Sequence, residues 1–218
     1  MGFSRSEIPS IVTPLRFIFW GGLICIFDLN FASTSNGEGF RFDLLNDFVG
    51  MLMITWGVFR LASLQVDDRY RSAMLFVQIV AVLSCIEALH AHVIYDTPLL
   101  IAVATTLLGI AALIATVLFC VAMQWLSDAA GLQRAAASWQ VTTILFVAIY
   151  LIPLGLFYSA ALLAMITGNS FQIDLGPAGL LLLPVFCIPL VHLFISTSRM
   201  RADAEVVGRW DEEGQVTA

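Results

Sequence analysis

Long apolar runs, each close to the thickness of a bilayer, are the feature that most constrains this chain. A helix needs about 20 mostly apolar residues to cross the hydrocarbon core of a membrane. Of the 218 residues, 60% are hydrophobic and only 12% are charged. A water-soluble fold of this size has too little interior to hide so much apolar surface. The sequence therefore predicts an all-α, polytopic integral membrane protein whose surface is largely covered by lipid.

The runs predict about six transmembrane helices in a single domain that covers residues 1–198. A short acidic cytoplasmic tail is predicted at 199–218, and no Gly/Ser linker divides the chain. The predicted spans are residues 15–33, 46–65, 72–95, 98–126, 138–167 and 177–197.

The basic residues predict the orientation of these spans. All ten are arginines, and they lie singly or in small groups at the ends of the apolar runs. Basic residues gather in cytoplasmic loops, whereas a nucleic-acid-binding protein would cluster them on one exposed face. With six spans and the N-terminus inside, nine arginines lie on the cytoplasmic side and only Arg41 lies outside. We therefore expect both termini in the cytoplasm and no nucleic-acid partner.

Each predicted external connection carries an aspartate shortly before the next span, namely Asp43, Asp96 and Asp174. Aspartate is a favoured N-cap, because its carboxylate accepts hydrogen bonds from the free N–H groups of the first helical turn. The main interpretation is three helix caps at the outer face. The alternative is a repeated hairpin with carboxylates around an outer mouth.

Residues 43–50 have the sequence Asp-Leu-Leu-Asn-Asp-Phe-Val-Gly and run into an apolar helix. This segment resembles a motif of small bacterial polytopic membrane proteins of uncharacterised function, with the approximate pattern Asp-x-Leu-Pro-Asp-Phe-Ile-Gly. Asn46 stands where that pattern has Pro. The resemblance implies a bacterial inner-membrane location and carries no activity. Gly50 is expected to let another helix approach closely.

Asp28 and Glu87 are the ionisable residues predicted to lie deepest in the membrane. At 1.5 Å per residue, Asp28 lies about 18 Å beyond Arg16 and Glu87 about 24 Å beyond Arg71, which places both in the outer half. An ionisable residue inside a span is costly to insert and is a functional hypothesis by default. The alternative is that each carboxyl faces a water-filled vestibule or is hydrogen-bonded between helices.

If the first three spans pack together, we expect a proton or cation site between them. Its predicted residues are Asp28, Glu87, His90 and Asp47, the last at the start of the second span. Glu87 and His90 share one helix face, as in di-iron bundles, but such bundles need two copies of this spacing. A Glu87–His90 hydrogen bond is therefore expected, without a metal or another cofactor. His192 is predicted at the inner interface.

The sequence leaves three functions open. The first is a small proton- or cation-linked transporter or channel, in which Pro153, Pro184 and Pro189 bend the last two spans. The second is a non-catalytic accessory or assembly subunit, and the third is a membrane enzyme that uses Glu87 and His90. No catalytic motif is present in the sequence. For a transporter or channel, we expect a homo-oligomer in the lipid bilayer.

Overall fold

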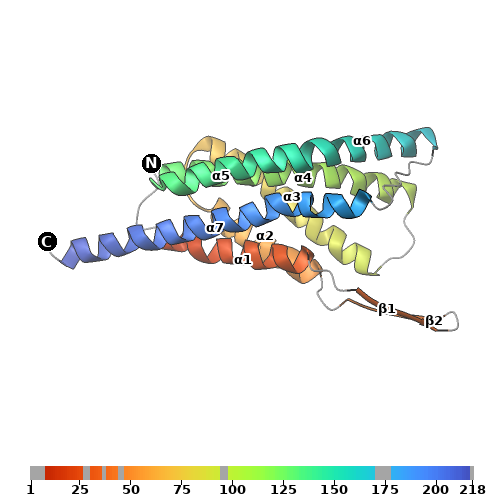
Figure 1. The fold of residues 1–218 in the computed structure, drawn as a ribbon, viewed down its shortest axis with the longest axis horizontal. Coiled ribbons are helices and arrows are strands. Elements are labelled where there is room, and N and C mark those ends of the chain that lie inside the picture. The colour runs from red at the N-terminus through yellow and green to blue at the C-terminus, as the bar shows by residue number, and fades with distance from the viewer. Residues whose placement is uncertain are drawn as a thin grey trace.

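The computed structural model of the protein describes residues 8–26, 30–35, 38–43, 47–93, 98–169 and 178–216. The elements are α1 (Ile8–Ile26), β1 (Asn30–Ser35), β2 (Glu38–Asp43), α2 (Asp47–Ala62), α3 (Asp68–Val93), α4 (Leu99–Ala129), α5 (Gln133–Phe146), the π-helix η2 (Val147–Leu151), α6 (Ile152–Thr167) and α7 (Ala178–Val216). The elements α5, η2 and α6 follow one another without a break and form one long helix. The described helices therefore form six rods (Figure 1).

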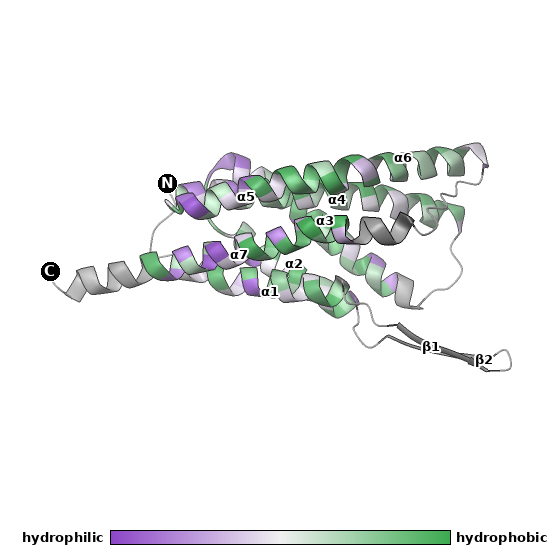
Figure 2. Cartoon of the chain, in the orientation of Figure 1, coloured by the Kyte–Doolittle hydropathy of each residue, from purple (hydrophilic) through white to green (hydrophobic). Residues whose placement is uncertain are grey.

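The six rods form a closed bundle. Helices adjacent in the sequence pack together from α1 to α5, and α7 closes the ring by packing against α5 and α1. Figure 1 shows that α1 begins and α7 ends at one end of the bundle, here the terminal end, and that the β1–β2 hairpin lies at the opposite end, here the hairpin end. Hydrophobic residues follow the length of the rods, while hydrophilic residues gather toward the terminal end (Figure 2).

Three helices in the described part of the chain are long and apolar enough to cross a membrane. They cover Asp68–His90, Leu99–Ala129 and Gln133–Thr167, the last of which unites α5, η2 and α6. The helix Ser10–Cys25 is apolar but shorter. The prediction of a helical protein compatible with a membrane is confirmed to this extent.

The structure departs from the predicted boundaries near both ends of the chain. The first helix begins at Ile8 and ends at Ile26, and residues 30–33 of the predicted span belong to β1, which pairs antiparallel with β2. Asp43 is the last residue of β2, four residues before α2, and its role as a cap of that helix stays a prediction. Asp96 and Asp174 lie outside the described residues. The last helix extends through most of the predicted tail to Val216, because that stretch is rich in strong helix formers.

Local signals fix the ends of the long helices. The side chain of Asp67 accepts a hydrogen bond from the backbone N–H of Tyr70 at 2.7 Å and so caps α3. Gly131 and Gly168 follow α4 and α6 with φ of 74° and 71°. This left-handed conformation is readily adopted by glycine, which is why both helices stop there.

The tightly packed core lies at the terminal end. Trp139 and Tyr70 are completely buried there, and the Tyr70 hydroxyl donates to the carbonyl oxygen of Leu61 at 2.7 Å, which ties α3 to the end of α2. The Trp139 indole N–H donates to the sulfur of Met200 at 3.2 Å. By contrast, α6 contributes no buried residue. The bundle is therefore compact at the terminal end and loosely packed along α6.

Glycines bring α1 and α2 into close contact, as expected for Gly50. A Cβ atom at Gly50 would lie 2.6 Å from the sulfur of Cys25 and 2.7 Å from the carbonyl oxygen of Gly21. A Cβ atom at Gly57 would lie 2.7 Å from the carbonyl oxygen of Pro14. Small residues let membrane helices gain dispersion energy through close backbone approach. Gly22, by contrast, has nothing within 4 Å of its Cβ position.

The two substitutions Gly50→Ala and Gly22→Ala should therefore change stability in opposite directions. Gly50→Ala should lower the free energy of unfolding by about 1–3 kcal/mol, because the methyl group overpacks the α1–α2 contact. Gly22→Ala should raise it by roughly 0.5–1 kcal/mol, because alanine favours the helix and meets no neighbour. Thermal unfolding in detergent measures both, and equal effects would contradict the close α1–α2 contact.

Candidate functional site

A buried polar cluster lies between α5 and α7. Ser138 and Thr142 are four residues apart on α5, and His192 and Ser196 have the same spacing on α7, so each pair presents one face to the other helix. Ser138, Thr142 and Ser196 are at most 3% exposed. These four residues, here the hydroxyl–histidine cluster, bring polar side chains together in a helix interface that is otherwise largely apolar.

Short hydrogen bonds connect the cluster. The Ser196 hydroxyl oxygen lies 2.8 Å from that of Ser138 and 2.7 Å from that of Thr142. The Thr142 hydroxyl oxygen lies 2.9 Å from Nδ1 of His192, and Ser196 lies 3.4 Å from the same nitrogen. Arg199 donates to the Ser138 hydroxyl at 3.4 Å. The chain of contacts therefore runs from a guanidinium through three hydroxyls to an imidazole.

One arrangement of hydrogen atoms satisfies all of these contacts. Thr142 has one hydroxyl proton and donates it to the carbonyl oxygen of Ser138 at 3.0 Å, so its own oxygen accepts from Ser196 and His192. Ser196 then accepts from Ser138, and Ser138 accepts from Arg199. With the hydrogens assigned in this way, a neutral His192 carries its proton on Nδ1 and keeps Nε2 as an acceptor.

Two helix irregularities lie next to the cluster, toward the hairpin end. Pro153 has no N–H to donate, and just before it the rod loosens into η2, in which the N–H of Ile152 donates to the carbonyl oxygen of Val147. Across the interface, Pro189 is buried inside α7. The Tyr150 hydroxyl of η2 donates to the carbonyl oxygen of Phe186, one turn before Pro189, at 2.5 Å.

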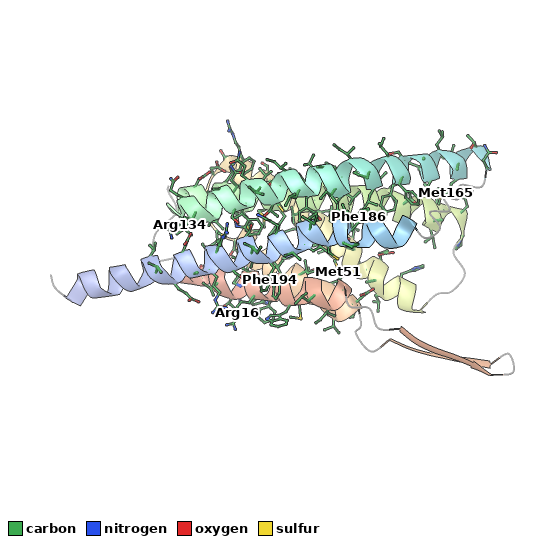
Figure 3. All side chains as sticks on the ribbon, in the orientation of Figure 1. Arg16, Met51, Arg134, Met165, Phe186 and Phe194 are labelled. Carbon is green, nitrogen blue, oxygen red and sulfur yellow. The ribbon has the colours of Figure 1, made fainter. Side chains whose placement is uncertain are left out.

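The structure shows the local backbone at the prolines, while the predicted bends of the last two spans stay a prediction. The expected disturbance at Pro153 takes the form of a π-helix, and α7 continues as one helix through Pro184 and Pro189. A proline ring removes one backbone hydrogen bond and crowds the preceding turn. The bond from Tyr150 attaches the neighbouring rod to that weakened turn. Figure 3 shows Phe186 and Phe194 on α7, and His192 lies between them along the chain.

His192 also borders a shallow groove of about 260 Å³ on α7. Its other lining side chains are apolar apart from one thiol: Pro184, Cys187, Ile188, Val191 and Ile195. The imidazole therefore stands at the boundary between the buried hydroxyls and an apolar surface.

The predicted site at the hairpin end is described in part. Asp28 lies outside the described residues, Asp47 is the first residue of α2, and Glu87 and His90 lie in the last two turns of α3. The hydroxyl of Thr55 on α2 donates to the carbonyl oxygen of Ala81 on α3 at 3.3 Å, and this contact fixes the relative height of the two helices. Asp47 lies eight residues before Thr55 on α2, so it is about 12 Å nearer the hairpin end than Thr55. At this height Asp47 is level with the last turns of α3.

The expected Glu87–His90 hydrogen bond is not formed, and among the described residues the buried Nε2 of His90 has no hydrogen-bond partner. In the same part of the chain no three His, Cys, Asp or Glu residues lie close enough to hold a metal ion. Whether the carboxylates share one pocket stays a prediction.

Sequence reasoning missed the three hydroxyl residues of the cluster and placed His192 only at the inner interface. A signal was present, because Ser138-x-x-x-Thr142 and His192-x-x-x-Ser196 each place two polar residues on one face of an apolar helix. The pairing of α5 with α7 across some fifty residues of sequence is not visible in that spacing.

Comparison with known proteins gives no match to a family model, to a curated protein or to a solved structure. The function must therefore be inferred from the residues and their geometry.

The cluster predicts unequal effects for two neighbouring threonines. Thr142→Val should lower the free energy of unfolding by about 1–3 kcal/mol, because His192 and Ser196 lose a buried partner. Thr143→Val should change it by less than about 0.5 kcal/mol, since that hydroxyl donates only to the carbonyl oxygen of Trp139 in its own helix. Thermal unfolding in detergent compares the two variants, and equal stability would contradict the network.

Proposed function

We propose that the protein is a small proton-linked transport protein of the bacterial inner membrane, with six spans and both termini in the cytoplasm. The six rods of the bundle and the shared location of the start of α1 and the end of α7 support an even number of crossings (Figure 1). The arginine asymmetry of nine to one supports the terminal end as the cytoplasmic side. The resemblance of residues 43–50 supports the inner membrane.

The observation that carries the proposal is the position of His192. Its Nδ1 lies within hydrogen-bond distance of the buried hydroxyls of Thr142 and Ser196. When Nδ1 carries the proton of the neutral ring, Nε2 is the acceptor. Histidine is the side chain whose charge changes most readily near neutral pH. Ionisable residues inside membrane helices commonly mark ion or proton pathways, and helix irregularities commonly accompany such sites in transporters.

The hydroxyl chain orients His192 and is not itself the proton's exit to the cytoplasm. Arg199 lies at the far end of that chain, and a guanidinium repels a proton and cannot accept one. A proton taken up at Nε2 leaves the Nδ1–H bond to Thr142 in place, so protonation requires no change in the hydroxyl network. Exchange therefore occurs through Nε2, and Glu87 and His90 are the proton-accepting groups nearer the hairpin end.

A non-catalytic accessory subunit is the second candidate, and α6 favours it. This helix packs mainly against α4 and presents large exposed apolar residues along its length. They include Ile152, Leu156, Phe157, Leu163 and Ile166. A partner protein or a second copy would cover such a surface, as would lipid.

Reporter fusions test the topology. Because the even number of crossings follows from the arginine distribution, fusions after Gly37, Thr97 and Asn169 should report the outside. Fusions after Asp67, Gly131 and Gly208 should report the cytoplasm. A reporter on the unexpected side at any of these positions would contradict the six-span arrangement.

Proton flux tests the function itself. Purified protein in liposomes that contain a pH-sensitive dye should move protons, and His192→Gln and Glu87→Gln should each lower the rate at least about tenfold, the range expected for loss of a proton-transfer group. Glu205→Gln, which changes an exposed residue paired with Arg201 on α7, is the matched control and should keep the rate. Unchanged flux in folded His192→Gln protein would overturn the proposal, and so would the lack of flux in the unmodified protein.

A further inference from the structure

A cluster of aromatic and basic side chains lies on the outer surface of the α1–α2 pair. On α1 the exposed residues Arg16, Phe17 and Trp20 follow one helix face, and on α2 the residues Trp56 and Arg60 do the same. The rings of Phe17 and Trp56 lie 4.4 Å apart between centroids, so the two faces adjoin and form one surface.

Both tryptophans of this surface are exposed. Trp20 is 55% exposed and Trp56 is 39% exposed. Tryptophan gathers at membrane–water interfaces, because its ring is amphipathic and sits well at the level of the lipid headgroups. Trp56 lies in the last two turns of α2, at the terminal end, and therefore marks the depth of a headgroup layer there.

The Arg60 side chain is held over this aromatic platform. Its guanidinium carbon lies 5.3 Å from the centroid of the Trp56 ring, within the range of a cation–π interaction. Stacking on a ring face leaves the in-plane N–H donors available, and these are the groups that bind a phosphate in pairs.

Among the described residues, neither arginine has a carboxylate partner. In the described part of the chain the ion pair that forms joins Arg201 to Glu205 on α7, and Arg16 and Arg60 have no carboxylate within 4.0 Å. Both arginines are exposed, and Figure 3 shows Arg16 projecting from α1 away from the bundle. Two uncompensated positive charges next to interfacial aromatic rings complement an anion that is anchored at the same depth.

We propose that this surface, formed by Arg16, Phe17, Trp20, Trp56 and Arg60, binds the phosphate of an anionic phospholipid in the leaflet at the terminal end. The guanidinium groups contact the phosphate, and the aromatic rings contact the glycerol backbone and the first part of the acyl chains. The aromatic platform favours a lipid over a soluble phosphate, because a small hydrated anion gains nothing from the rings. This site is independent of proton transport.

Lipid-dependent unfolding of the purified full-length protein tests the proposal. A ligand that binds only the folded state stabilises it by RT ln(1 + [L]/Kd), so the melting temperature rises as the affinity or the concentration of the ligand rises. In a neutral detergent, phosphatidylglycerol should raise the melting temperature more than phosphatidylcholine does, and glycerol 3-phosphate should not raise it. An equal shift by glycerol 3-phosphate would show a soluble phosphate site and overturn the lipid assignment.

Paired variants locate the effect. The apparent affinity for phosphatidylglycerol should fall at least about fivefold in Arg16→Gln/Arg60→Gln, because one basic side chain near an anionic lipid is worth roughly that factor. Arg69→Gln/Arg71→Gln removes the same charge from exposed positions at the start of α3 and should keep the affinity. Trp56→Leu keeps both charges and should weaken binding, since Arg60 loses its platform.

The melting temperatures without added lipid show whether each variant folds. If a double variant fails to fold, Arg60→Gln alone should still lower the affinity, and Arg69→Gln alone should not. An equal loss of affinity for phosphatidylglycerol in the two double arginine variants would show a general charge effect and overturn the site. The site would also be overturned if the unmodified protein showed no preference for phosphatidylglycerol.

Discussion

Lipid offers no hydrogen bonds, and the organisation of this bundle follows from that constraint. In lipid, backbone N–H and C=O groups must find their hydrogen-bond partners within the protein, and a buried polar side chain without a partner is costly. Most of its helical hydroxyl groups donate to the carbonyl oxygen four residues earlier in their own helix, as do those of Thr106, Thr116, Ser127, Thr143, Ser159 and Thr197. Ser138 and Ser196 differ, because they bond across the α5–α7 interface. Hydroxyls that link two helices in this way specify which faces meet.

The same constraint explains the contrast between the two ends of the bundle. At the terminal end, Trp139 and Tyr70 are buried and their polar atoms are paired, which links α5 to α7 and α3 to the end of α2. Beyond η2 the rod packs along α4, and α6 has no buried residue. The hydroxyl–histidine cluster and the Tyr150–Phe186 bond lie on the boundary between these regions. A protonatable group on such a boundary can respond to its surroundings without unfolding the core.

The helical class, and helices at most of the predicted spans, could be predicted from the sequence, because apolar length and glycine or aspartate signals act locally. The hairpin was missed, although Asn36-Gly37 between two short polar segments is a known signal for a two-residue turn. Gly50 was correctly expected to face a neighbouring helix. The prediction of a Glu87–His90 hydrogen bond was wrong, because two side chains on the same helix face do not necessarily make contact. The cluster around His192 depends on tertiary pairing, which helix periodicity does not determine.

In the proposed function, buried hydroxyls orient His192 so that Nε2 exchanges a proton. Nitrogen-15 NMR of the protein in lipid bilayers tests this most directly, and the His192 signals are identified among the three histidines by their loss in His192→Gln. We predict a neutral ring protonated at Nδ1, with a second proton that appears on Nε2 as the pH is lowered while the protein stays folded. A neutral ring protonated at Nε2, or one that stays neutral at every pH at which the protein is folded, would contradict the account.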